Sequence, residues 1–220
     1  MKRILTALFI LAISVSAFSL GVSMGVGASG AYSWETTAST LGGTTQTDTT
    51  YGVPLNFKAF IDVTYFEVSG GYMMRNGTST KSDITGSPSS TSTSSDKKGW
   101  ITAALLAKIP IKLGSVTLFP LVGVEYYKNL SYTDANGNDL KAALPADQQA
   151  DLDQFWLAAG IGADISLGKI IYIRPEILVG YKLPSKLEND TVTLLKGLGA
   201  SSASWLPLAV SGGVSVGFKF

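Results

Sequence analysis

The stretch Trp205–Phe220 (WLPLAVSGGVSVGFKF) decides the fold, because apolar residues alternate with small or polar ones up to its last position. One face carries Leu206, Leu208, Val210, Val214, Val216, Phe218 and Phe220. A period of two residues is typical of a β-strand whose two faces meet different surroundings. The stretch also exceeds the roughly 9 to 11 tilted residues that cross a bilayer. It therefore predicts a strand long enough to span a membrane.

The same period recurs in seven earlier runs, separated by connections of two kinds. The runs are 18–34, 51–59, 66–74, 100–111, 116–127, 155–167 and 171–183, with a bend expected near Asp62 between the second and the third. Short turns alternate with long polar segments at 35–50, 76–98, 128–154 and 184–204. Such alternation is the layout of transmembrane β-barrels, which have short turns on one side and long loops on the other.

Two of the long segments carry further expectations. Residues 86–95 (GSPSSTSTSS) have too little apolar surface to order themselves, so we expect a mobile surface loop there. Residues 139–152 mix Ala, Leu, Gln and Asp around Pro145, and they could form one or two helical turns or a solvated coil.

The N-terminus has the pattern of an export signal. Lys2 and Arg3 precede an apolar stretch at 4–15 that is too short to span a bilayer, and small residues follow it. We expect cleavage after Ala17, which gives a signal peptide at 1–17 and a single transmembrane β-barrel domain at 18–220.

Composition excludes several classes of function. The chain of 220 residues has neither cysteine nor histidine, so zinc sites of Cys and His, Ser-His-Asp triads and thiolate nucleophiles are absent. We therefore expect no enzyme, no cofactor and no metal site. A net charge of +1 leaves no long-range field to attract nucleic acid.

The alternation alone would also fit a soluble ligand-binding barrel. The residues on the polar face distinguish that barrel from a membrane barrel. In the first run that face offers Ser, Gly and Ala, which suit a crowded interior better than a hydrated surface. The apolar face brings aromatic residues repeatedly to one rim, as an interfacial girdle requires. These are Tyr32, Trp34, Tyr51, Tyr72, Tyr126 and Tyr181, with Phe18, Phe218 and Phe220 at the other end. We predict an all-β, eight-stranded, antiparallel up-and-down transmembrane barrel.

The chain resembles the small outer-membrane β-barrels of the OmpW, OmpX and OmpA-domain group. The resemblance rests on the signal peptide, the eight runs and the ending at 213–220 (GVSVGFKF). It implies residence in the bacterial outer membrane, in contact with its lipid. It also implies that the barrel-assembly machinery recognises the last strand through Val214, Val216, Phe218 and Phe220.

Charged residues fall on the interior face of the predicted barrel. Lys58 and Glu67 flank one short turn, Asp164 and Arg174 flank another, and each pair can meet across its hairpin. Lys108, Glu125 and Glu176 have the same parity along their strands. This set is either a salt-bridged core that fills a narrow barrel or part of a polar conduction path.

Aromatic residues form a second interior candidate, a lumen mouth that could bind a ligand. By parity Trp100, Trp156 and Trp205 point inward near the outer strand ends, beside Tyr127 and above Phe119 and Leu121. A bulge would turn these tryptophans to the lipid-facing girdle instead.

The resemblance to OmpW implies that such a lumen binds or passes small hydrophobic molecules, or that the barrel has a structural role in the membrane. The alternative is an adhesin or evasion factor whose long Ser/Thr-rich loops engage host or surface ligands. A barrel enzyme conflicts with the missing histidine.

Overall fold

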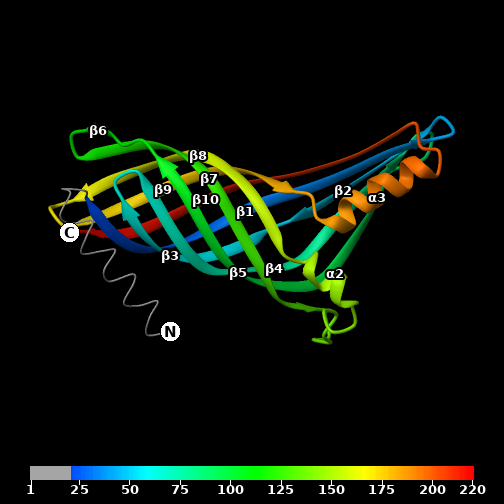
Figure 1. The fold of residues 1–220 in the computed structure, drawn as a ribbon, viewed down its shortest axis with the longest axis horizontal. Coiled ribbons are helices and arrows are strands. Elements are labelled where there is room, and N and C mark those ends of the chain that lie inside the picture. Colours follow the sequence, from blue (N-terminus) through cyan, green and yellow to red (C-terminus); the bar gives the residue numbers. More distant parts are fainter. Residues whose placement is uncertain (1–20) are drawn as a thin grey trace.

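The computed structural model describes residues 21–220, and its strands close into one antiparallel sheet (Figure 1). The strands are β1 (Val22–Leu41), β2 (Thr44–Gly52), β3 (Pro54–Val63), β4 (Phe66–Ile84), β5 (Ser90–Lys108), β6 (Ile111–Leu113), β7 (Val116–Thr133), β8 (Gln154–Leu167), β9 (Ile171–Leu183) and β10 (Ser202–Lys219). Within residues 21–220 they make a ring of eight arms, since β2 with β3 and β5 with β6 each form one interrupted arm. β10 pairs with β1 from Ser23↔Lys219 to Thr40↔Ser202, which closes the barrel.

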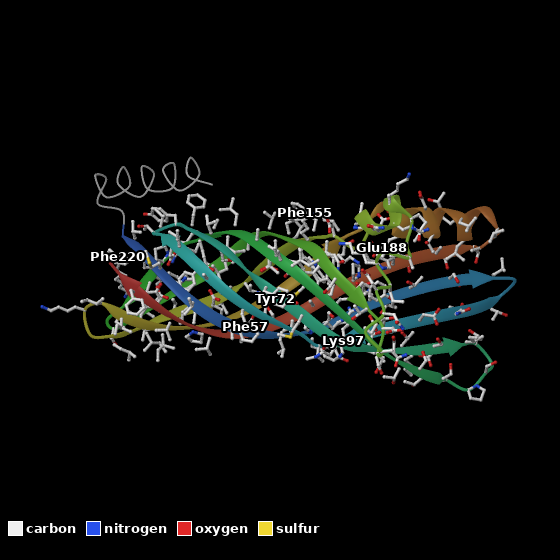
Figure 2. The ribbon with its side chains drawn as sticks, turned by 90° about the horizontal axis from the view of Figure 1, so that it is seen from below. Phe57, Tyr72, Lys97, Phe155, Glu188 and Phe220 are labelled. Atoms are coloured by element: carbon white, nitrogen blue, oxygen red, sulfur yellow. The ribbon has the colours of Figure 1, made fainter. Side chains whose placement is uncertain are left out.

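The two faces of the sheet confirm the predicted barrel. Apolar side chains such as Val26, Val122 and Ile177 point outward with 57–63% of their surface exposed, whereas Phe119 and Arg174 are fully buried inside. A barrel that stands in water would have the opposite arrangement. In Figure 2 the oxygen- and nitrogen-bearing side chains gather at the end of the molecule where Lys97 and Glu188 lie.

Aromatic rings mark the two ends of the apolar surface. At the outer end the ring of Tyr32 lies 5.8 Å from that of Tyr51, and the rings of Tyr126 and Phe155 lie 5.9 Å apart. At the inner end, with the short turns, Phe218 and Phe220 are exposed. The membrane-spanning part lies between these rims. Here and below, the outer end is the end of the barrel where α3 lies, and the inner end is the one with the short turns.

The structure corrects the first two long loops. Segments 35–50 and 76–98 are mainly strand, because β1 and β2 continue to a turn at 42–43 and β4 and β5 continue to one near 85–89. Ser90–Ser94, expected in a mobile loop, pair with β4. Figure 1 shows β1 and β10 running past the barrel toward α3. We call this extension of β10, β1, β2, β4 and β5 the outer sheet.

Hydroxyl pairs explain why a sequence without an apolar face still forms the outer sheet. Across β1 and β2, Thr36 bonds to Thr49 at 3.2 Å and Thr40 bonds to Thr45 at 2.9 Å. Across β2 and β4, Thr50 bonds to Thr80 at 2.9 Å. Threonine favours extended backbone, and the barrel strands below fix the register of each hairpin.

The two edges of the outer sheet differ. On one side β10 contacts helix α3 (Lys186–Gly197), and Pro207 lies near the point where the pairing of β10 with β9 begins. On the other side, residues 90–94 of β5 pair with β4, and residues 90–96 pair with no second strand within the described chain, because the ladder to β7 starts at Lys97. The edge of β5 at 90–96 is therefore open.

Smaller corrections concern strand limits and helices. The bend expected near Asp62 lies at Thr64 and Tyr65, so Asp62 belongs to β3. The fourth run breaks at Pro110, between β5 and β6. Of the two alternatives for 139–152, helical turns or a solvated coil, the structure has a short helix, α2 (Ala146–Ala150).

Helix α3 was not predicted, although Ser185 and Glu188 form a capping box at its start. None of the described helices is long and apolar enough to cross a bilayer. The signal peptide expected at 1–17 and the predicted strand start at Phe18 lie outside the described residues.

Candidate functional site

A buried network of ion pairs, which we call the charge belt, crosses the barrel near its inner end. Its members are Lys58, Asp62, Glu67, Lys108, Asp164, Arg174 and Glu176. Arg174 is at the centre: its Nε and Nη2 contact the two carboxylate oxygens of Asp164 at 2.6 and 3.0 Å. Its Nη2 also reaches Asp62 at 2.5 Å, and its Nη1 reaches Glu67 at 2.7 Å. One guanidinium thus serves three carboxylates, as its five N–H donors allow.

Two lysines complete the charge belt. Lys108 Nζ lies 2.5 Å from Asp62, and Lys58 Nζ lies 3.0 Å from Glu67 and 2.6 Å from Glu176. Each carboxylate of the belt therefore contacts at least one cation, which offsets the cost of burying charge. The expected hairpin pairs, Lys58 with Glu67 and Asp164 with Arg174, both lie within contact distance.

Three aromatic rings pack around Arg174. Its guanidinium carbon lies 4.9 Å from the centroids of Phe60 and Phe119 and 5.1 Å from that of Tyr172. Each ring lies over a glycine of the neighbouring strand, where a Cβ would come within 2.5, 2.4 and 2.1 Å of a ring atom. These glycines are Gly25, Gly162 and Gly217. Phe119, Tyr172 and Arg174 have no exposed surface, so these side chains close the centre of the lumen at this level.

Two small cavities lie on the outer side of the charge belt, each of about 60 Å³. The polar part of the wall of the lower cavity includes Asn56, Lys58, Thr102, Glu125, Glu176 and Ser211. The upper cavity has a wall that includes Met73, Arg75, Trp100, Glu125, Trp156 and Leu178. They share Met73, Glu125, Tyr127 and Leu178, so they are stacked along the lumen. Each volume corresponds to a few water molecules.

The aromatic residues of the predicted mouth line the inside of the barrel. Trp100 and Trp156 are 2% and 6% exposed. The indole of Trp100 donates to the carbonyl of Leu152 at 3.2 Å, and that of Trp156 donates to Gln154 at 3.0 Å. The ring of Tyr127 lies 6.1 Å from that of Trp156. Trp205 is half-buried, with Lys182 Nζ 5.2 Å from its ring centroid.

Above the upper cavity the lumen widens into a hollow of about 430 Å³, the vestibule. It shares Ser33, Glu35, Arg75, Trp100 and Gln154 with the upper cavity, so the three spaces are continuous. Lys182 bridges Glu35 at 3.2 Å and Glu188 of α3 at 2.5 Å. Arg75 lies 3.7 Å from Asp96. Burial, together with the charge of Arg75, lowers the pKa of Lys98 in the vestibule wall to about 8.

Phe119 and Leu121 lie deeper than the tryptophans, as expected, but they do not line the two cavities. Phe119 packs on Arg174 and Lys108, and Leu121 belongs to the buried cluster beside it. Glu125, grouped with the belt charges by parity, lies one level higher and accepts a hydrogen bond from the Tyr127 hydroxyl. Within residues 21–220 no group of three or more His, Cys, Asp or Glu side chains is placed to hold a metal ion.

A closed sheet with an apolar exterior, aromatic rims and a charged interior needs lipid around it. The chain folds as an outer-membrane β-barrel. No protein-family model and no curated protein sequence matches this barrel.

Solved structures that resemble the barrel include the outer membrane protein OprG from Pseudomonas aeruginosa, at 14% identity and a TM-score of 0.43, over 91% of this chain and 96% of that one. Neisserial surface protein A matches at 12% identity and a TM-score of 0.44, over 87% and 96%. Ail, the attachment invasion locus protein of Yersinia pestis, solved with the heparin analogue sucrose octasulfate, matches at 14% and 0.30, over 91% and 99%. At these identities the likeness concerns the fold alone.

Several interior residues of the barrel were not predicted from the sequence. Asp62 and Phe60 have the same parity as Lys58 on β3, but the bend expected near Asp62 removed them from the pattern. Tyr172 has the parity of Arg174 on β9. A continuous strand through 63 would have found the first two. Lys182 binds α3, which was not predicted, so no signal in the strand pattern pointed to its partner Glu188.

Proposed function

We propose that this outer-membrane barrel binds small, largely hydrophobic molecules in the outer half of its lumen and does not pass them through. One observation carries the proposal: the vestibule and the two cavities open toward the outer end, while the charge belt seals the inner end. Of the two roles implied by the resemblance to OmpW, the geometry supports binding over passage. The role requires no covalent chemistry.

Planar-bilayer recording of the refolded protein tests the sealed lumen. We expect no unitary conductance from the wild-type protein, because Arg174 and the rings around it close the centre of the lumen. Titration with a small apolar solute such as hexanol should quench or shift the fluorescence of Trp100 and Trp156, which line the upper cavity. Steady channel openings would contradict the proposal. A titration without any saturable change would contradict the binding role.

The outer sheet supports a second candidate function, adhesion to a host or surface ligand. The specific observation is the open edge at 90–96 of β5, whose backbone groups can pair with an extended segment of another protein. Replacing residues 78–94 by a short turn should abolish binding of such a ligand by whole cells and leave the barrel folded. A matched control is Ser185→Ala, which alters α3 at the covered edge. Unchanged adhesion after the truncation would exclude this function for the hairpin.

The last strand has a role of its own during assembly. Val214, Phe218 and Phe220 point outward with 56%, 43% and 77% of their surface exposed, and Val216 shares that face. This supports recognition by the barrel-assembly machinery before the strand closes on β1. We expect Phe220→Ala to lower the yield of heat-modifiable protein in the outer membrane, while Val122→Ala on the same lipid-facing surface has a smaller effect.

A further inference from the structure

The wall of the lower cavity carries unbalanced charge. Its charged lining residues among those described are Lys58, Glu125 and Glu176. Lys58 is already bonded to Glu176 and, on its other side, to Glu67 of the charge belt. The described wall of the cavity therefore carries two carboxylates and one cation, Lys58. Lys58 also contacts a third carboxylate, that of Glu67, which lies outside the cavity.

Neither carboxylate has a full set of donors. Glu176 lines the cavity, 6% of its surface is exposed, and its enclosed Oε1 has no hydrogen-bond partner in the described chain. The hydrogen bond that Glu125 accepts comes from the uncharged hydroxyl of Tyr127. Buried carboxylates are expected to contact a cation or several donors. The lower cavity thus has more negative than positive charge in its described wall, and Glu125 has no cation partner there.

We propose that the ligand of this lumen is a cation, a primary ammonium on a slim apolar chain, with its ammonium in the lower cavity beside Glu125 and Glu176. The inference rests on the proposed binding function and specifies its ligand. A cavity of about 60 Å³, enough for a few water molecules, has room for an ammonium group and a methylene or two. Ser211, Thr102 and Asn56 line the same space and can accept further N–H donors.

The upper cavity suits the apolar chain of such a ligand. Met73, Leu178, Ala158 and the rings of Trp100 and Trp156 line it, and they lead from the vestibule down to Glu125. Arg75, the cation of this level, is held by Asp96 at 3.7 Å, and its guanidinium lies 5.8 Å from the ring of Trp100. The ammonium therefore passes Arg75 and binds below it, where the carboxylates are.

Three probes with the same alkyl chain separate charge from hydrophobicity: hexylammonium, hexanol and hexanoate. They are titrated by calorimetry into the full chain in phosphatidylcholine nanodiscs, and the heat of empty nanodiscs is subtracted. We expect hexylammonium to bind roughly tenfold more tightly than hexanol, or better, since a hydrogen bond to a charged group contributes about that factor. Hexanoate should bind most weakly.

Variants locate the effect. Glu125→Gln keeps the shape of the side chain and should remove most of the preference for hexylammonium over hexanol. Asp83→Asn, the same carboxylate-to-amide change on the exposed outer sheet, should keep it. Heat-modifiable gel mobility reports whether each variant is folded. If Glu125→Gln does not fold, Tyr127→Phe gives the answer: it frees the carboxylate of Glu125, so hexylammonium binding should be retained or tightened, and its loss would contradict the proposal.

The outcomes keep the two proposals apart. Equal binding of hexanol and hexylammonium by the wild-type protein would overturn the cation inference and leave the binding function standing. A preference that survives Glu125→Gln would also overturn it. If none of the three probes binds, both proposals fail.

Discussion

Arg174 is expected to be the most costly single residue of the barrel to remove. In Arg174→Leu, Asp62 keeps Lys108 at 2.5 Å and Glu67 keeps Lys58 at 3.0 Å. Asp164 alone loses its cation, because both of its contacts within the belt are to Arg174. Breaking a buried pair and leaving one charge uncompensated costs about 3–5 kcal/mol. The unfolding equilibrium should thus shift by roughly two to four powers of ten.

The assay is guanidinium unfolding of the refolded protein in detergent micelles, followed by tryptophan fluorescence and gel mobility. If the orphaned Asp164 is the cause, Arg174→Leu with Asp164→Leu should recover most of the lost free energy, since an apolar replacement of both partners is often close to neutral. Lys81→Met breaks the exposed pair with Asp83 and should leave the midpoint unchanged. A double variant as unstable as the single one would refute this reasoning.

Three further predictions concern packing, capping and charge. Gly217→Ala would bring a methyl group within 2.1 Å of Tyr172 Cζ, and it should lower the free energy of unfolding by about 1–3 kcal/mol. Gly212→Ala is the control: no atom lies within 4 Å of the added methyl group, so the denaturant midpoint should not change. Ser185→Ala removes the cap of α3 and should destabilise that helix by about 1 kcal/mol, seen as faster amide exchange in α3 with an unchanged barrel midpoint. The pKa of Lys98, held at about 8 by burial, lies below the ordinary value of 10.5, so the unfolded chain binds more protons between these values and stability should rise with pH in that window. Arg75→Gln should raise the pKa of Lys98, as NMR of the methylated lysine can measure; an unchanged pKa would rule out this contribution.

The barrel itself could be predicted from the sequence because lipid imposes a simple rule on each spanning strand. Outward residues must be apolar, so the period of two is strong wherever a strand crosses the membrane. The inward position of Lys58 and the outward position of Phe57 both follow from it.

The rule fails above the outer rim, where both faces meet water. There the strands of the outer sheet are held by hydroxyl pairs and by the register of the barrel below, neither of which gives an apolar period. Composition therefore indicated loops at 35–50 and 76–98.

The sequence predicted which residues of the candidate site face the lumen, but not how far along the barrel axis each of them lies. The alternation along each strand placed Glu125 and Arg174 on the inner face of the barrel. It does not tell how far each residue lies along the barrel axis, because neighbouring strands are shifted against one another. The structure puts Glu125 in the cavities and Arg174 in the belt. The partners of Arg174 come from β3, β4 and β8, so only the closed barrel brings Asp62, Glu67 and Asp164 together.

The seal of the lumen and the seam of the barrel are built from the same side chains. Tyr172, one of the rings around Arg174, lies over Gly217 of β10, and its hydroxyl is 2.8 Å from that of Ser23 on β1. Ser23 also donates to Asp62 of the charge belt at 3.3 Å. A movement that opened the belt would thus disturb the pairing of β1 with β10, where the sheet closes. A gate has to move at little cost, whereas this seal moves only with the barrel wall, and this coupling supports the proposal that the lumen binds from its outer end and does not conduct.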